Sequence, residues 1–274
     1  MTHHYCVVGN PIAHSKSPLI HGLFAAHCGI DLEYGRAELP LDGFREAFTR
    51  LLQEQYRGCN VTAPFKGEVV PLCRQISDRA RLAQAVNTVI RLPDGSLRGD
   101  NTDGVGLVTD LSRNLQHRLQ DKRILIAGAG GAARGILPSL LESRPAQVVI
   151  SNRTHARAEQ LAAALSAYGP LAARPYTELD SRFDLIINAT SASFGSDVPP
   201  VPGHCIDGDT VCYDLVYSDE PTAFLRWCES RGAGALHDGL GMLVEQAAES
   251  FYLWEGVRPD NSAAIIQQLR NTAP

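Results

Sequence analysis

The sequence predicts an α/β protein of two domains, and three observations support this fold class. Strand patterns and helix patterns alternate along the chain, as they do when helices pack against sheets. An apolar strand, a glycine-rich turn and a helix follow one another around residue 128. The chain has 274 residues, which is long for a single hydrophobic core. We therefore expect an open α/β domain at the N-terminus, a doubly wound nucleotide-binding domain after it, and a cleft between them.

The glycine-rich turn is the most informative stretch of the chain. Residues 124–127 are apolar and predict a buried strand, and a helix pattern begins after the turn. Gly128 would make the tight turn, Gly130 would let the backbone approach a pyrophosphate, and Ala133 would allow close packing of helix and sheet. These glycines alone leave a purely structural turn as the alternative. The cofactor-binding candidates in the turn are Gly128, Ala129, Gly130, Gly131 and Ala132.

The second domain, expected over residues 104–236, continues with the same alternation. Its expected strands are 123–127, 147–151, 183–188 and 210–215, and its expected helices are 131–142, 155–167 and 221–231. The strands are mostly continuous apolar runs, which suit a parallel sheet covered by helices on both faces. This pattern is typical of a Rossmann-type, doubly wound sheet.

The first domain, expected over residues 1–103, has its own strands and helices. Its expected strands are 5–8, 33–39, 58–61, 88–91 and 97–99, and its expected helices begin at Pro18, Leu41 and Asp78. The turn signal Pro93-Asp94-Gly95 predicts that the last two strands pair as a hairpin. A helix over 104–115 would open the second domain. The C-terminal residues 237–274, with a long helix and a helix over 262–269, are expected to pack back on the first domain.

The composition is that of a globular protein, with 44% hydrophobic and 20% charged residues. A net charge of −5 offers no basic surface for nucleic acid or for an anionic membrane. We expect a cytoplasmic protein, because no apolar run could span a membrane and the first residues lack a signal-peptide pattern. The seven cysteines are an odd count without CxxC spacing and predict reduced thiols. The nine histidines form no metal motif, so no metal site is expected.

A set of separate motifs between residues 9 and 242 points to one family. They are Gly9-Asn-Pro-Ile-Ala-His-Ser-Lys-Ser-Pro18, Asn60-Val-Thr-Ala-Pro-Phe-Lys66, Ala85-Val-Asn-Thr88, Gly99-Asp-Asn-Thr-Asp-Gly104, Gly128-Ala-Gly-Gly-Ala132, Asn152-Arg-Thr154 and Asp238-Gly-Leu-Gly-Met242. With these motifs in this order, the chain resembles the shikimate dehydrogenases. These enzymes reduce 3-dehydroshikimate to shikimate with NADPH, on the route to chorismate and the aromatic amino acids. The resemblance implies NADP as the cofactor, an N-terminal substrate domain, and a monomer or homodimer.

Reduction of a ring ketone needs a hydride donor, an acid for the developing alkoxide, and groups that hold the substrate. The resemblance implies that Lys66 and Asp103 are the catalytic pair, in which the ammonium protonates the oxygen and the carboxylate holds the lysine. Without the resemblance, a surface lysine and a helix cap would be the simpler interpretations. Ser15 and Ser17 match the family's Ser-x-Ser, which holds the substrate carboxylate. They could instead be an N-terminal capping pair for the helix that begins at Pro18. The other substrate-binding candidates are Asn60, Thr62, Asn87, Tyr217 and Gln246.

The cofactor candidates outside the glycine-rich turn follow the later strands. An NAD enzyme places an acidic residue after the second Rossmann strand, whereas this chain has Asn152, Arg153 and Thr154 there. Guanidinium groups suit the 2′-phosphate of NADP, and Arg157 could add a second one or be an ordinary surface cation. The resemblance implies further cofactor contacts, namely Asp78, Thr190 with the stretch up to residue 193, and Leu215 and Gly239, which match family positions near the nicotinamide.

Three competing functions remain at this point. A quinate/shikimate dehydrogenase with broader substrate or coenzyme use is the first alternative. A non-catalytic nucleotide-binding or redox-sensing module is the second, but the presence of both Lys66 and Asp103 argues against it. A methyltransferase would share the glycine-rich turn but would want an acidic residue where Asn152 and Arg153 stand.

Overall fold

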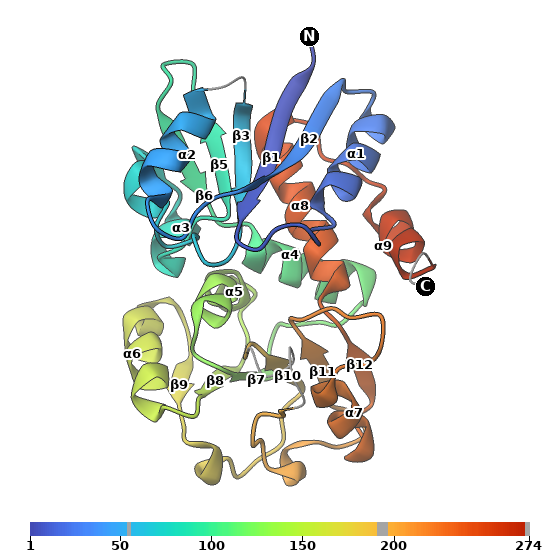
Figure 1. Ribbon diagram of the computed structural model, residues 1–274. Coiled ribbons are helices and arrows are strands. Elements are labelled where there is room, and N and C mark those ends of the chain that lie inside the picture. The colour runs from blue at the N-terminus through green and yellow to red at the C-terminus, as the bar shows by residue number, and fades with distance from the viewer. Residues whose placement is uncertain (54–55, 191–196, 272–274) are drawn as a thin grey trace. The chain divides into compact units, whose positions relative to one another are not determined.

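The chain folds into two compact units, and each contains a β-sheet with helices against it (Figure 1). The computed structural model describes residues 1–53, 56–190 and 197–271. The first unit comprises Met1–Gly106 and Val244–Asn271, and the second comprises Leu107–Leu243. The predicted α/β fold class is confirmed. The predicted domain boundaries, after residues 103 and 236, stay predictions about how the functions are divided.

The sheet of the first unit is mixed, with its six described strands in the order β2-β1-β3-β5-β6-β4. The strands are β1 (His3–Gly9), β2 (Leu32–Glu38), β3 (Tyr56–Val61), β4 (Gln75–Ile76), β5 (Thr88–Arg91) and β6 (Leu97–Asp100). Strands β2 and β3 run parallel to β1, whereas β5 is antiparallel to both of its neighbours. The predicted hairpin is therefore confirmed, because β5 and β6 pair with Thr88 opposite Asp100.

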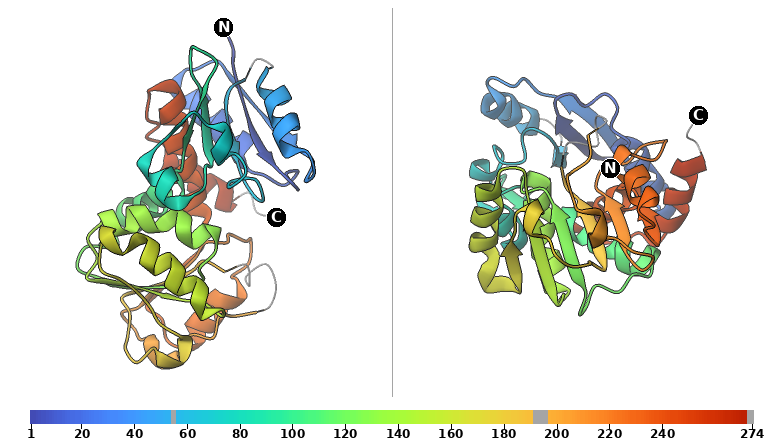
Figure 2. Two further views of the ribbon diagram at one scale, coloured as in Figure 1. Left: turned by 90° about the vertical axis from the view of Figure 1, so that its left-hand side faces the viewer. Right: turned by 90° about the horizontal axis from the view of Figure 1, so that it is seen from below.

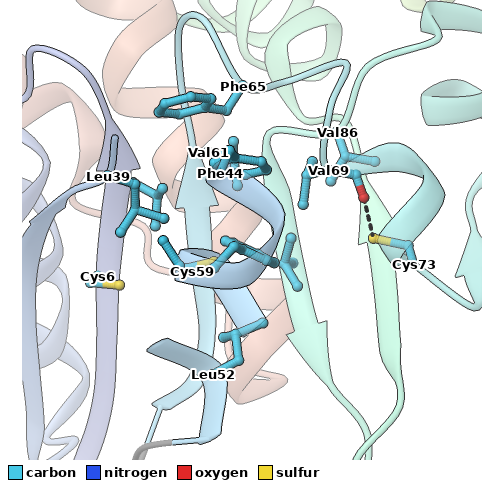
Figure 3. Packing of buried hydrophobic residues seen from close by; sticks show 14 of the residues in the cluster. Cys6, Leu39, Phe44, Leu52, Cys59, Val61, Phe65, Val69, Cys73 and Val86 are labelled. Atoms are coloured by element: carbon cyan, nitrogen blue, oxygen red, sulfur yellow. Dashed lines mark hydrogen bonds between the residues drawn. The ribbon is translucent and has the colours of Figure 1, made fainter. Parts of the chain in front are cut away.

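One face of this sheet carries an apolar core (Figure 3). Cys6 of β1 and Cys59 and Val61 of β3 point to this face, since alternate residues of a strand share a side. Helix α2 (Phe44–Gln53) covers them, and Phe44 stacks on Phe65 with ring centroids 4.2 Å apart. The short helix α3 (Asp78–Ala83) adds Ala80 to the same cluster. Phe44, Ala47 and Phe48 thus belong to the face that α2 buries.

The intervening strand residues contact helices α1 (Ser17–Cys28) and α8 (Leu240–Glu255). Tyr5 of β1 stacks on Trp254 of α8 with ring centroids 4.4 Å apart. His21 of α1 is fully buried and stacks on Tyr34 of β2 at 4.3 Å. Burial lowers the pKa of His21 to about 3, so this imidazole is neutral at physiological pH. Helix α9 (Ser262–Asn271) completes the described part of the unit.

Gly58 of β3 lets α8 lie directly on the sheet. A Cβ atom there would stand 2.3 Å from the Val89 carbonyl oxygen and 2.7 Å from Nε1 of Trp254. That Nε1 group donates a hydrogen bond to the same oxygen at 3.0 Å. We therefore expect Gly58→Ala to lower the free energy of unfolding by about 1–3 kcal/mol through overpacking.

Urea denaturation of Gly58→Ala and wild type measures this difference. Gly22→Ala is the matched control, because Gly22 lies in α1 and an added Cβ meets nothing within 4 Å. The control should be neutral or gain up to about 1 kcal/mol from helix propensity. If the two variants unfold at the same urea concentration, the contact of α8 with β3 is looser than described.

The sheet of the second unit is wholly parallel, with its described strands in the order β12-β11-β10-β7-β8-β9. The strands are β7 (Arg123–Ala127), β8 (Gln147–Ser151), β9 (Leu171–Ala173), β10 (Leu185–Asn188), β11 (Val211–Asp214) and β12 (Ala235–His237). Helices α5 (Gly131–Glu142) and α6 (His155–Leu165) connect β7, β8 and β9, and α7 (Ala223–Ser230) connects β11 and β12. Because such crossovers are right-handed, this order places α5 and α6 on one face and α7 on the other. Figure 2 shows α5 and α6 together on one face.

Three short strands and one helix differ from the sequence-based expectation. Strands β4, β9 and β12 have two or three residues each, too few to show a period, and pairing with a neighbouring strand defines them. The helix expected over 104–115 is instead α4 (Asp103–Thr109), followed by a π-helical turn at Asp110–Asn114. Among the described residues, no helix combines the length and the apolar character that a membrane span requires.

Candidate active site

Lys66 and Asp103 form a close ion pair in the first unit. Lys66 lies in the turn after β3, and Asp103 is the first residue of α4, three residues after the end of β6. The Nζ atom of Lys66 donates to Oδ2 of Asp103 at 2.6 Å. The Lys66 side chain is 32% exposed and that of Asp103 is 10% exposed, so the lysine can reach a bound molecule while the carboxylate is mostly enclosed. A charge-assisted hydrogen bond of this length fixes the ammonium group in one place.

Asn87 fixes the other oxygen of Asp103. Its Nδ2 group donates to Oδ1 of Asp103 at 2.8 Å and lies 3.3 Å from Oε1 of Gln246. Its own Oδ1 accepts from the backbone N–H of Thr102 at 2.8 Å. Asn87 is 2% exposed, so its amide serves to hold the loop that carries Asp103. The polar cluster of Lys66, Asp103, Asn87 and Gln246 brings together four residues that the sequence places far apart.

Asn60 is hydrogen-bonded within the protein on both ends of its amide. The Nδ2 group lies 3.1 Å from the Asn87 carbonyl oxygen and 3.0 Å from Oγ of Ser250, and Oδ1 accepts from the Tyr34 hydroxyl at 2.7 Å. This arrangement agrees with the alternative that Asn60 satisfies polar groups at a strand end, and its contact with substrate stays a prediction. Thr62 is half-buried and also takes part in backbone bonding, since its N–H donates to the Val8 carbonyl oxygen at 2.8 Å.

The structure adds residues that the sequence analysis missed. Asn60 is hydrogen-bonded to Tyr34 and Ser250, and Asn87 is hydrogen-bonded to Thr102. Oγ of Ser250 also lies 2.8 Å from the hydroxyl of Thr88. Burial raises the pKa of the Tyr34 hydroxyl well above its usual value, so it remains a hydrogen-bond donor. Ser250 could have been found from its spacing, because it follows Gln246 by four residues and therefore shares its helix face.

Ser15 and Ser17 lie at the start of α1. Oγ of Ser15 accepts from the backbone N–H of Ser17 at 3.2 Å, whereas the N-cap residue of α1 is Lys16, where no side chain caps the helix. The guanidinium group of Arg36, on β2, donates to the Ser15 carbonyl oxygen from NH2 at 2.6 Å and from Nε at 3.2 Å. Arg36 is exposed, so a cation stands beside the loop that was predicted to bind a carboxylate. No sequence signal links these two residues, which are on different elements.

In the second unit, the glycine-rich turn has the geometry that its sequence predicts. Gly128 has φ 117°, and a Cβ there would lie 2.9 Å from the carbonyl carbon and oxygen of Ala189. At Gly130 and Gly131 a Cβ would meet nothing within 4 Å, so the N-terminus of α5 opens on unfilled space. Gly130 is the N-cap residue and no side chain caps this helix. The backbone N–H groups at the start of α5 fit a pyrophosphate, which a helix N-terminus attracts.

The other predicted cofactor positions lie at the carboxyl ends of the same parallel strands. Asn188, the last residue of β10, accepts from the N–H and the hydroxyl of Thr190 at 3.1 and 2.7 Å. The N–H of Leu215, just after β11, donates to the Asn188 carbonyl oxygen at 3.0 Å. A Cβ on Gly239 would stand 2.2 Å from the Leu215 carbonyl oxygen, so these two predicted positions touch. Residues 191–193, also predicted to follow the cofactor, lie outside the described residues.

Arg153 and Thr154 are exposed after β8, and Arg157 is exposed on α6. The Nδ2 group of Asn152 donates to the Thr154 carbonyl oxygen at 2.9 Å and so shapes this turn.

Two further predicted residues remain, one in each unit. Asp78 begins α3 in the first unit and pairs with Arg81, and its cofactor role stays a prediction. Tyr217 is half-buried in the second unit, where burial raises the pKa of its hydroxyl, and its substrate contact also stays a prediction.

Comparisons with known proteins agree on one family. Residues 7–89 match the model of the shikimate dehydrogenase substrate binding domain, residues 110–194 that of shikimate / quinate 5-dehydrogenase, and residues 239–270 that of the shikimate 5'-dehydrogenase C-terminal domain. The shikimate dehydrogenase (NADP(+)) of Thioalkalivibrio sulfidiphilus is 51% identical over 271 residues, covering 98% of this chain and 99% of that relative.

Solved structures give the same result. The Ael1 enzyme of Pseudomonas putida is 44% identical with a TM-score of 0.91, covering 97% of this chain and 98% of that one. The shikimate 5-dehydrogenase of Thermus thermophilus, in complex with NADP(H) and shikimate, is 31% identical with a TM-score of 0.86, covering 99% of this chain and 100% of that one. The resemblance found in the motifs is confirmed, and the chain belongs to the shikimate dehydrogenase family.

Proposed function

We propose that this protein catalyses the reversible, NADP-dependent reduction of 3-dehydroshikimate to shikimate. The observation that carries the proposal is the Lys66–Asp103 pair, held at 2.6 Å and braced by Asn87 on the other carboxylate oxygen. An acid for the ketone oxygen must be fixed in place and still reach the substrate. The bond to Asp103 meets the first need, and the 32% exposure of the Lys66 side chain meets the second. The family relatives named NADP-dependent shikimate dehydrogenases support the same reaction.

The proposed proton transfer uses the Nζ atom of Lys66. NADPH, when bound, supplies the hydride that adds to the ketone carbon. As negative charge develops on the ketone oxygen, Lys66 donates a proton to it and becomes a neutral amine. Asp103 keeps the ammonium group aimed before the reaction and Asn87 keeps Asp103 from turning away. In the reverse direction, the neutral amine accepts the proton of the alcohol.

The coenzyme is proposed to bind along the carboxyl ends of β7, β8, β10 and β11. The open N-terminus of α5 would take the pyrophosphate, and the exposed guanidinium groups of Arg153 and Arg157 would take the 2′-phosphate. We assign the coenzyme domain to residues 104–236 and the substrate domain to residues 1–103 with 237–274. The seven cysteines are all free thiols, which supports a reducing, cytoplasmic location.

The reaction is tested by following NADP reduction with shikimate and with quinate side by side. We expect turnover with shikimate and much less with quinate, whose additional hydroxyl group on the carboxylate-bearing carbon needs space and a partner of its own. Comparable rates with both compounds would favour the quinate/shikimate alternative. No turnover with either compound would contradict the proposed function.

We expect Ser15→Ala and Ser17→Ala each to raise the KM for shikimate roughly 10-fold, because each removes a hydrogen bond to a charged carboxylate. Ser96→Ala is the matched control, since Ser96 bonds Asp94 in the β5–β6 turn and should leave KM unchanged. The measurement is repeated with a substrate analogue that lacks the carboxylate. An equal rise for both compounds would mean that the serines only shape the loop, as the bond between Oγ of Ser15 and the Ser17 N–H allows.

A further inference from the structure

A buried carboxylate contacts the N-terminus of α8 in the second unit. Asp110, the first residue of the π-helical turn, is 3% exposed. Its Oδ2 atom accepts from the hydroxyl of Tyr213 at 2.7 Å, and Oδ1 accepts from Nδ2 of Asn114 at 3.0 Å. The Tyr213 hydroxyl in turn accepts from the backbone N–H of Met242 at 3.3 Å. Asp110 and Tyr213 thus connect the π-helical turn and β11 to the first turn of α8.

Gly241 of α8 lies directly against this carboxylate. A Cβ atom there would stand only 2.0 to 2.3 Å from the carboxyl atoms of Asp110, so the carboxylate occupies the place of a side chain. The position of Asp110 is also electrostatically suited, because the N-terminus of a helix attracts negative charge. Burial, together with the Asp110 charge, raises the pKa of Tyr213 well above its usual value, so its hydroxyl keeps the proton that it donates. Tyr213 is itself fully buried.

The same segment carries the predicted nicotinamide contacts. Gly239 rests on the Leu215 carbonyl oxygen, and its N–H donates to the Val216 carbonyl oxygen at 3.2 Å. Two residues later the chain meets Asp110, and one residue after that it meets the Tyr213 hydroxyl. The Asp110–Tyr213 pair therefore anchors the far side of the turn whose near side would face the nicotinamide ring.

We propose that Asp110 and Tyr213 are positioning residues for the nicotinamide end of the coenzyme, acting through residues 239–242. This inference rests on the proposed function, because it assumes that Leu215 and Gly239 contact the ring. Asp110 and Tyr213 themselves touch neither coenzyme nor substrate. Their effect is to hold the backbone of Gly239 at one distance from Leu215, which keeps the ring in the orientation that hydride transfer needs.

The test compares Tyr213→Phe and Asp110→Asn with wild type, by calorimetric binding of two ligands. NADPH carries the nicotinamide ring, whereas adenosine 2′,5′-bisphosphate carries only the half that Arg153 and the glycine-rich turn would bind. We expect the Kd for NADPH to rise roughly 10-fold and the Kd for the bisphosphate to change less than about twofold, since only one hydrogen bond near the ring is lost. The deuterium isotope effect on kcat with 4-deuterated NADPH should also rise, because a misplaced ring makes hydride transfer slower.

Tyr176→Phe is the matched control, since Tyr176 is buried in the same unit in a hydrophobic cluster with Phe183 and Cys205. It should leave both affinities and the isotope effect unchanged. Should Asp110→Asn fail to fold, Tyr213→Phe carries the test alone. An equal loss of affinity for both ligands in Tyr213→Phe, or a lower melting temperature with an unchanged Kd and isotope effect, would overturn the inference. Wild-type enzyme without any turnover of shikimate and NADP would instead overturn the proposed function.

Discussion

Lys66→Ala should lower kcat for shikimate oxidation by roughly 10²–10⁴-fold, the usual contribution of a positioned general acid or base. The Nζ atom of Lys66 is held 2.6 Å from Asp103, and alanine leaves no group there to accept the proton of the alcohol as it is oxidised. The KM for shikimate should change far less, because the lysine acts mainly in the transition state. Steady-state kinetics at neutral pH with saturating NADP measures both constants.

A second lysine–aspartate pair in the chain provides the control. Lys122 donates to Oδ1 of Asp184 at 2.9 Å, and the side chains are 43% and 37% exposed. Lys122→Ala removes an ion pair of the same kind, whose exposed setting is worth little to stability, and should keep wild-type kcat. A Lys66→Ala variant with near-wild-type kcat would show that another group accepts the proton of the alcohol.

Arg153→Ala should raise the KM for NADP roughly 10- to 150-fold, the range expected for one charge-assisted contact to a phosphate. The KM for NAD should stay nearly unchanged, because NAD lacks the 2′-phosphate. Added salt should narrow the wild-type preference for NADP, since Arg153 is exposed and dissolved ions screen its charge. The measurement is steady-state kinetics with both coenzymes at saturating shikimate.

Arg182→Ala is the control for charge alone, because Arg182 is 71% exposed in the same unit and pairs with Asp207. Its loss should leave both coenzyme constants as they are. Equal losses with NADP and NAD in Arg153→Ala would indicate that Arg153 stacks on the adenine instead. A wild-type enzyme indifferent to the two coenzymes would contradict the assignment of the 2′-phosphate site.

The sequence was most informative where local pattern and structure coincide. Strands β7 and β8 were predicted with their observed bounds, because each is an apolar run bounded by turn residues. The φ of Gly128 followed from the turn that its position requires. Strand β9 was missed because Leu-Ala-Ala is too short to show a period, and only its pairing with β8 makes it a strand.

In the candidate site, the sequence predicted the residues that lie in local motifs but not the contacts between separate elements. Motifs single out Lys66 and Asp103, and the structure places them together, while their catalytic roles stay predictions. Arg36 and Ser15 lie on different elements, and neither local sequence predicts the bond from Arg36 to the Ser15 carbonyl oxygen. Asp110 was expected to lie in a regular helix. Neither its π-helical turn nor its contact with Gly241, far along the chain, produces a recognisable pattern in the sequence.

The path of the chain through the first unit bears on how the protein is made. Asn60 bonds Ser250, and the Tyr5 hydroxyl donates to Glu255, so one face of the sheet is covered by a helix from the other end of the sequence. A ribosome adds about 5–20 residues per second, so the stretch from Gly106 to Val244 takes on the order of ten seconds to synthesise. During that time the nascent chain presents Phe24, Tyr5 and Tyr34 without the α8 residues that bury them. This face of the sheet therefore acquires its covering helix only after translation has passed through the whole second unit.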